Sequence, residues 1–275
     1  MTTSEGDDPV RARFGPNAGE VDAAAARTLA PILGRASCRR FRDAPVPLGV
    51  LRAVGAAALS APSKSDLQQR DVIVVACAEQ RDRLRALVAA QAWIAGAPSL
   101  LVICANNRRQ RRLHARRGRP FANDHMDAVF NASVDAGIAL ATAVVAAEAL
   151  GLGCCPISTI RNEADAASAV LGLPDHVFVV AMLAVGRPAE GARRVSPRLP
   201  LSHTLHVDRY DETGLDAALD AYDARHALDR ATQRRVDRFG RADPYAWSDD
   251  KTRQYASPER AGWGDHLRRK GFRLD

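Results

Sequence analysis

Alternating polar side chains near residue 37 form the first candidate for chemistry in this sequence. Arg35, Ser37 and Arg39 are separated by Ala36 and Cys38. In an extended backbone alternate residues share a face, so the two guanidiniums and the hydroxyl would point the same way. Planar guanidiniums match the geometry of phosphate oxygens, which predicts a phosphate site. An ordinary arginine-rich surface segment is the alternative.

A polar loop that leads into an expected strand is the second candidate. Its residues Ser63, Lys64, Ser65 and Gln68 supply hydroxyls, an amide and one lysine. These groups can bind the pyrimidine edge of a flavin or a nucleotide without titrating. A plain polar turn explains the same composition equally well.

The third candidate is the segment from Gly151 to Thr159. A dinucleotide fingerprint needs three glycines between a strand and a helix, whereas here an expected helix precedes a strand and only two glycines are present. The Rossmann interpretation is therefore excluded. Backbone N–H groups near Ser158 and Thr159 remain available to face a ligand.

Prolines around Arg198 mark a fourth candidate, because they stiffen the run Ser-Pro-Arg-Leu-Pro that begins at Ser196.

The sequence argues against three other kinds of functional site. His203 and His206 lack the carboxylates or cysteines that would complete a metal site, so no metal is predicted. The sequence has neither a nucleophile elbow nor a P-loop, which counts against hydrolases and NTPases.

The composition is that of a large folded chain with an excess of positive charge. Its 275 residues are 47% hydrophobic and carry a net charge of +7. Such a charge favours anionic partners: nucleic acid, a membrane surface or a phosphorylated cofactor. Seven arginines lie between Arg108 and Arg119. This segment is expected to be a solvated loop, and contact with nucleic acid is the alternative.

The termini and cysteines indicate the cytoplasm. Five cysteines form no CxxC pair, which fits a reducing compartment. The first ten residues are acidic and show no apolar run, so no signal peptide is expected. The most apolar stretch, residues 136–147, is too short and too close to Asp135 and Glu148 to cross a bilayer. It is expected to be a buried helix that needs partners on every side.

Hydrophobic periodicity predicts alternating helices and strands around that apolar helix. Helices are expected over residues 22–33, from Pro47 to before Pro62, over 79–92, over 123–150 and from a cap at Asn162 to Gly172. Strands are expected over residues 72–76, 99–104, 154–158 and 176–185. This order predicts a layered α/β or α+β domain.

The chain divides into three parts by composition. Residues 1–20 are expected to be a disordered tail, residues 21–200 the folded core and residues 201–275 a polar C-terminal extension. Aromatic side chains in the extension need cover, so it is expected to pack on a partner subunit. These side chains are Tyr245, Trp247, Tyr255 and Trp263.

Together and in this order, the four candidates resemble the nitroreductase family. The resemblance is strongest to its NADPH-preferring oxygen-insensitive nitroreductase and flavin reductase branch. It runs from Arg35 to Pro200 and continues in residues 243–249 and 267–272. The resemblance implies an α+β fold, a three-layer sandwich with a central β-sheet flanked by helices. It also implies an intertwined homodimer whose interface forms two FMN sites.

By this resemblance, Arg35, Ser37 and Arg39 would hold the FMN phosphate and ribityl chain together with Arg198. Gln91 would lie near the pyrimidine ring, and the segment from Pro156 would pass along the isoalloxazine. The residues assigned to FMN are Arg35, Ala36, Ser37, Cys38, Arg39, Ser63, Lys64, Ser65, Gln68, Gln91, Pro156, Ile157, Ser158, Thr159, Ser196 and Arg198.

Arginines in the extension fit the 2′-phosphate of NADPH because a guanidinium matches phosphate geometry. The residues concerned are Arg235, Arg238 and Arg241. Two positions depart from the family pattern: Asp66 stands where many relatives carry Asn, and Ser196 where the branch carries a lysine. The resemblance implies that losing this lysine removes a positive group from the phosphate site, and Arg193 or Arg194 is the candidate that compensates for it.

The expected reaction needs no catalytic side chain, because the cofactor carries the difficult chemistry. NAD(P)H would pass a hydride to flavin N5 and leave, and a nitroaromatic, a quinone or free flavin would replace it in a ping-pong cycle. A positive group near the N1 and O2 edge, such as Lys64, would tune the flavin. Dehalogenation or flavin breakdown in the same fold, and a basic nucleic-acid-binding module, are the alternatives.

Overall fold

The computed structural model describes residues 9–15 and 21–275, which fall into two compact units. The sheet unit comprises Ser37–Arg193 and Arg260–Asp275. The second unit comprises the described residues up to Ala36, together with Arg194–Glu259. These limits differ from the predicted boundaries at residues 20 and 200, because the last 16 residues belong to the sheet unit and residues 21–36 do not.

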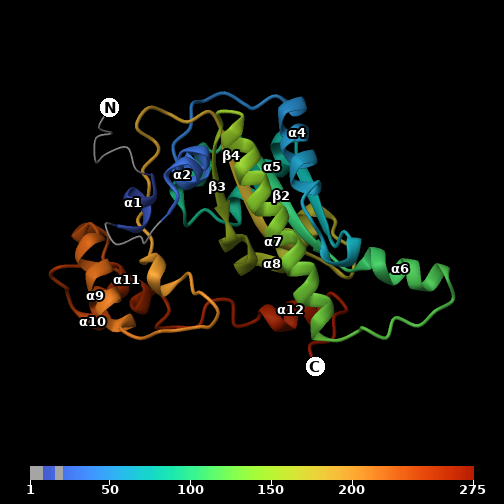
Figure 1. Cartoon of the computed structure of the whole chain (residues 1–275). Helices are drawn as coiled ribbons and strands as arrows, with labels where there is room; N and C mark the ends of the chain where they lie inside the picture. The colour runs from blue at the N-terminus through green and yellow to red at the C-terminus, as the bar shows by residue number, and fades with distance from the viewer. Residues whose placement is uncertain (1–8, 16–20) are drawn as a thin grey trace. The chain divides into compact units, whose positions relative to one another are not determined.

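A four-stranded antiparallel sheet forms the centre of the sheet unit (Figure 1). Its order is β1-β2-β4-β3, and every position of β2 is buried. Continuous apolar runs are expected where a strand is covered on both faces. All four predicted strands are present, with ends shifted by one or two residues. The strands are β1 Arg70–Val75, β2 Ser99–Asn106, β3 Gly153–Ile157 and β4 Val177–Gly186.

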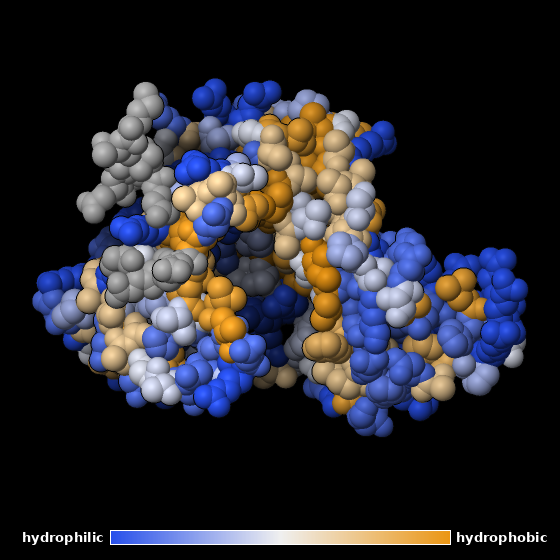
Figure 2. Space-filling view, in the orientation of Figure 1, coloured by the Kyte–Doolittle hydropathy of each residue, from blue (hydrophilic) through white to orange (hydrophobic). Residues whose placement is uncertain are grey.

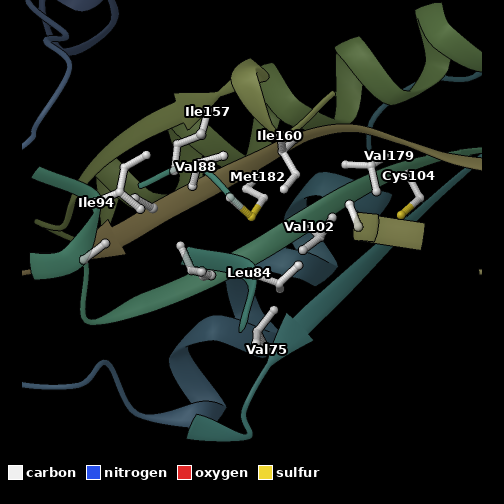
Figure 3. Packing of buried hydrophobic residues seen from close by; sticks show 14 of the residues in the cluster. Val75, Leu84, Val88, Ile94, Val102, Cys104, Ile157, Ile160, Val179 and Met182 are labelled. Carbon is white, nitrogen blue, oxygen red and sulfur yellow. The ribbon is translucent and has the colours of Figure 1, made fainter. Parts of the chain in front are cut away.

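Helices cover both faces of this sheet. The α-helices of the unit are α4 Leu48–Leu59, α5 Ala78–Ala86, α6 Arg108–Arg116, α7 Met126–Ala149, α8 Ala164–Leu171 and α12 Trp263–Arg269. Short 3₁₀ turns are η2 Lys64–Asp66, η3 Ala92–Gly96 and η4 Ser158–Glu163. Along β2, Leu101 packs with α4 and α7, whereas Val102 packs with Leu84 of α5 on the other face (Figure 3). The predicted three-layer α+β sandwich is confirmed.

The long helix α7 lies against the sheet along one face only. That face consists largely of alanines, which let the helix approach the strands closely: Ala132, Ala136, Ala139, Ala143 and Ala147. The helix is long and apolar enough to cross a membrane, and half of its most apolar window is buried inside the sandwich. The opposite face is exposed, so within one chain the helix lacks some of the packing partners that were predicted on every side. Its exposed residues include Met126, Phe130, Val134 and Val145.

The second unit is built from short helices. Its helices are α1 Pro9–Phe14, α2 Ala23–Thr28, α3 Ala30–Leu33, α9 Leu215–Arg225, α10 Val236–Phe239 and α11 Trp247–Gln254, with 3₁₀ turns η5 Leu201–His203 and η6 Arg230–Thr232. Part of the predicted disordered tail is the helix α1, because Val10 and Phe14 pack on Ala26 and Leu33. The rest of that prediction falls on residues 1–8 and 16–20, which lie outside the described residues.

Two local predictions were wrong. The basic segment forms the helix α6, which extends away from the sandwich (Figure 1). Its base is tethered because Arg109 pairs with Asp71 and Arg111 pairs with Asp124. Asn162 does not cap α8, since it lies within η4 and accepts a hydrogen bond from the Arg260 side chain.

The aromatic residues of the predicted extension are mostly covered by their own chain. Tyr245 is 1% exposed and donates a hydrogen bond to Asp250. Trp247 packs edge-on against Tyr222, and Trp263 against Phe178 of β4. Only Tyr255 among the four is largely exposed. Because their own chain covers most of these aromatic side chains, they do not need a partner subunit to cover them.

Candidate functional site

The phosphate candidate of the sheet unit is an extended segment beside β3. The Cys38 N–H donates to the Cys154 carbonyl at 2.9 Å, and the Arg42 N–H to the Arg187 carbonyl at 2.9 Å. A Cβ on Gly153 would lie 2.6 Å from the Cys38 sulfur, so only glycine permits this approach. Burial raises the pKa of the Cys38 thiol, which favours its neutral form.

The predicted alternation along this run is present. Ala36 and Cys38 are buried, whereas Arg35 and Ser37 are half-buried and Arg39 is exposed. The buried side chains anchor the segment, so Ala36 and Cys38 could contact a cofactor only through their backbones. Ser37 and Arg39 keep their polar groups available for an anion.

Trp93 links three predicted residues of the sheet unit. The Arg39 guanidinium lies 5.9 Å from the centre of the Trp93 ring, within the range of a cation–π interaction. The Trp93 indole N–H donates to Gln91 Oε1 at 3.1 Å, and Gln91 Nε2 donates to Thr159 Oγ1 at 3.0 Å. The structure thereby brings together Arg39, Gln91 and Thr159, which the sequence places far apart. Trp93 itself was missed, although it follows Gln91 by two residues.

A cavity of about 330 Å³ adjoins this group at Gln91. It is lined by α5 and the start of η3, through Asp82, Arg85, Ala86, Ala89, Gln91, Ala92 and Ala95. The lining is mostly small and apolar, with Gln91 and the Asp82–Arg85 ion pair as polar groups. A pocket of this composition suits a flat apolar ligand with a few polar edges.

The polar loop is a tight surface turn in an uncommon backbone conformation. Ser65, Asp66 and Gln68 have φ values of 49°, 54° and 51°. Each left-handed residue other than glycine costs about 1–2 kcal/mol. Ser63 Oγ accepts the Gln68 N–H at 3.1 Å, and the Lys64, Ser65 and Gln68 side chains are exposed.

The end of β3 presents alternating residues to solvent. Pro156 and Ser158 are exposed, whereas Ile157 is 2% exposed and belongs to the core between sheet and helices (Figure 3). Only the backbone of Ile157 is available to a ligand. Ser158 and Thr159 start the turn η4, where the strand had been expected to continue through Ser158.

In the second unit, Arg13 holds the remaining phosphate candidates together. This side chain is 5% exposed, and it donates to the carbonyls of Leu33 at 2.7 Å, of Arg35, and of Ser196 at 2.9 Å. The Arg198 N–H donates back to the Arg13 carbonyl at 2.7 Å. Sequence analysis missed Arg13 because it lies in the segment expected to be disordered, and no pattern marks a single buried arginine.

Tail arginines in the second unit divide into two groups. Arg234 and Arg253 pair with Asp250 and Asp249, and of the two only Arg253 is buried. Arg235 donates to Ser257 Oγ, Arg238 donates to the Ala256 carbonyl, and Arg241 is exposed. Within the described residues, none of these last three pairs with a carboxylate. The described part of the chain, residues 9–15 and 21–275, contains no group of three or more His, Cys, Asp or Glu side chains that could hold a metal ion.

The four-stranded sheet with helices on both faces defines an α+β sandwich, and comparisons with known proteins identify its family. Residues 32–187 match the model of the nitroreductase family, and residues 196–275 match that of the nitroreductase family, C-terminal domain. The chain therefore belongs to the nitroreductase family, as its sequence motifs indicated.

Three relatives show how far the similarity extends. An FMN reductase [NAD(P)H] of Bacillus subtilis (strain 168) is 35% identical over 192 residues, 68% of this chain and 76% of the relative. The structure of NfrA2 from B. megaterium has a TM-score of 0.80 and 31% identity over 90% of this chain and 98% of its own. The NADPH:FMN oxidoreductase of Vibrio harveyi complexed with NAD+ has a TM-score of 0.73 and 28% identity over 89% and 97%.

Proposed function

We propose that the protein is an FMN-dependent NAD(P)H oxidoreductase that reduces small acceptors such as nitroaromatics, quinones or free flavin. The observation that carries this proposal is the Arg39–Trp93–Gln91–Thr159 group beside a cavity of about 330 Å³. The relatives named FMN reductase and NADPH:FMN oxidoreductase confirm the predicted enzyme class and cofactors. The acceptor is the part that rests on the proposal alone.

The donor set fits a flavin mononucleotide. Ser37 and Arg39 offer a hydroxyl and a guanidinium from one face of an extended run, which suits a phosphate. Gln91 has its amide fixed by Trp93 and Thr159, so it can pair with a pyrimidine edge without titrating. Ser63, Ser65 and Gln68 add neutral polar groups from the loop.

Bound FMN supplies hydride transfer between NAD(P)H and the acceptor. The residues of this chain bind and orient it. The exposed Lys64 ammonium would stabilise negative charge on the bound flavin. Arg235, Arg238 and Arg241 would hold the 2′-phosphate of NADPH, and the lack of a carboxylate partner for each of them within the described residues supports this assignment.

The protein is further proposed to work as a homodimer in the cytoplasm. Met126, Phe130 and Val134 recur every four residues on the exposed face of α7, and Val145 continues the same stripe. Figure 2 shows apolar side chains along the α7 face turned to the viewer. An exposed apolar stripe of this length favours association, and a second copy of this chain offers the matching surface.

Purification tests the proposal directly. The folded protein is expected to be yellow, and anaerobic NADPH is expected to bleach it. Arg39→Ala should weaken FMN binding in a fluorescence titration, whereas Arg116→Ala, on the exposed part of α6, should not. A colourless, fully folded preparation that takes up no added FMN would overturn the assignment.

The acceptor is found by following the bleached protein as candidates are added one at a time. Rapid return of the yellow colour with a nitroaromatic, a quinone or free flavin, under anaerobic conditions, identifies a substrate class. Reoxidation by none of the three would contradict the proposed acceptors while leaving the flavin assignment intact. A halogenated aromatic in the same panel covers the alternative reaction in this fold.

A further inference from the structure

Asp135 places a carboxylate inside the apolar helix α7. The residue is 0% exposed and lies between Ala132 and Ala139 on the face that packs against the sheet. Burying a charge is costly unless it is paired and hydrogen-bonded. A carboxylate at this position therefore needs partners that repay the loss of hydration.

Its partners are the two ends of the polar loop. Asp135 Oδ1 accepts the Lys64 N–H at 3.0 Å, and Oδ2 accepts the Gln69 N–H at 3.0 Å. The Arg70 guanidinium lies 3.7 Å from Oδ2 and balances the charge. One carboxylate thus holds the loop near both ends, at Lys64 and at Gln69, and all four groups belong to the sheet unit.

The loop between these ends cannot relax to an ordinary conformation. Ser65, Asp66 and Gln68 have positive φ, which residues with a Cβ adopt rarely. Such strain persists only where the surrounding structure over-determines it. Apart from Asp135, the loop is held by the hydrogen bond of the Gln68 N–H to Ser63 Oγ, by Arg109 of α6, which donates to the Gln68 carbonyl, and by the buried Gln69 side chain.

We propose that Asp135 is a positioning residue of the flavin site. By fixing both ends of the loop, it keeps Ser63, Ser65 and Gln68 in the strained arrangement that presents their polar groups to FMN. The inference rests on the proposed function, because these three residues are assigned to the flavin only there. Asp135 itself touches no ligand and acts through the loop.

Substitution of Asp135 by Asn tests the role of the carboxylate. Asp135→Asn keeps the shape but offers one acceptor, and its NH₂ group faces the second backbone N–H, so one end of the loop is released. The FMN dissociation constant is expected to rise about tenfold or more, the effect of losing a charge-assisted hydrogen bond. The visible circular dichroism of bound flavin should change as well.

A matched control separates this effect from general loss of stability. Asp165→Asn removes hydrogen bonds of similar length from His266 and Arg269, on α8 and away from the loop. It is expected to lower the melting temperature while leaving the FMN dissociation constant within about twofold of wild type. An equal loss of FMN affinity in both variants would overturn the proposal.

A backbone variant tests the same contact without changing the buried residue. Lys64→Pro removes the N–H that donates to Asp135, and Ser63 already has the extended conformation that precedes proline (φ −136°, ψ 153°). Lys64→Ala removes the side chain and keeps that N–H. FMN binding should be weaker in Lys64→Pro than in Lys64→Ala, and equal affinities would contradict the role of Asp135 even if Asp135→Asn does not fold.

Rescue by glycine gives the sharpest readout. Adding Asp66→Gly to Asp135→Asn places a residue that tolerates positive φ inside the loop, so most of the lost FMN affinity should return. Absence of rescue would mean that loop strain is not what Asp135 controls. Ser63→Ala and Gln68→Ala test the underlying assignment separately: if wild type binds FMN and neither variant changes its affinity, the proposed site is wrong whatever Asp135 does.

Discussion

Trp93 joins Arg39 to Gln91, and a conservative change can separate its two contacts. Trp93→Phe keeps an aromatic ring beneath the Arg39 guanidinium but removes the indole N–H that donates to Gln91. The Gln91 amide is then held only by Thr159. We expect FMN affinity to fall about threefold to tenfold, which corresponds to one net hydrogen bond. Fluorescence titration measures it, with Trp247→Phe as the control that should leave the affinity unchanged.

Substitution of Arg13 is expected to weaken binding of the FMN phosphate without affecting binding of the flavin ring. Arg13→Met removes the guanidinium that donates to the carbonyls of Leu33, Arg35 and Ser196, although the Ser196 carbonyl keeps a hydrogen bond from Arg198 Nη1 at 3.3 Å. Losing the partner of a buried carbonyl costs about 1–3 kcal/mol. The melting temperature should fall, and FMN should bind more weakly. Riboflavin, which has no phosphate, should bind as to wild type. Equal losses for both ligands, or an effect of the same size from the exposed Arg27→Met, would contradict this role.

Sequence pattern predicted the side chains whose availability follows from local geometry. The alternation of Ala36 and Cys38 with Ser37 and Arg39 depends only on an extended backbone, so two-residue spacing was sufficient. Trp93, Arg13 and Asp135 act through contacts with segments distant in the chain. Nothing in their immediate neighbours marks those contacts, and they appear only in the folded structure.

Among the elements, α12 is attached to α8 through the Asp165 carboxyl, which titrates in acid. Hydrogen bonds from Arg269 and from His266 lower the pKa of the Asp165 carboxyl below its ordinary value of 3.8. Because the folded state has the lower pKa, the stabilisation is complete well above pH 3.8 and is lost as the pH falls through the lowered value. The loss is modest, since Asp165 is largely exposed and solvent screens the pair.

Trp263 reports this change because its ring stacks on His266. In a chain carrying Trp93→Phe and Trp247→Phe, its fluorescence should shift in acid below the range in which a free aspartate titrates. The shift should be absent after Asp165→Asn, in which the carboxyl is missing at every pH. Persistence of the same transition in Asp165→Asn would show that another group loosens α12.

Elements with strong hydrophobic periodicity were predictable, and those held by charge were not. β2 and β4 are apolar runs covered on both faces, and their signal is local. Seven of the nine residues of α6 are polar or charged, and only Leu113 and Ala115 are apolar. The sequence therefore showed no apolar face from which a helix could be predicted. Its ion pairs with Asp71 and Asp124 come from residues far along the chain.

At the scale of the whole molecule, one chain does not cover α7. The face toward the sheet is packed with alanines, whereas the opposite face keeps Phe130 at 60% exposure and Val134 at 42%. An apolar helix in a soluble fold is normally covered on every apolar side. The proposed cover by a second copy is supported by this exposed apolar face and does not require the C-terminal aromatics, most of which are already packed in their own chain.

Phe130→Asp tests that cover, because a carboxylate at the centre of the stripe would have to be desolvated in an interface between two copies. Sedimentation of wild type is expected to give twice the chain mass, and the variant should give the mass of one chain at micromolar concentration. Leu205→Asp is the matched control: Leu205 is 65% exposed but lies in the second unit, and its replacement should leave the mass doubled. If each flavin site draws on both chains, Phe130→Asp should also lose FMN at the concentration where it dissociates. If the variant is monomeric and keeps full FMN affinity, the proposed dimer through α7 stands, and each flavin site lies within a single chain.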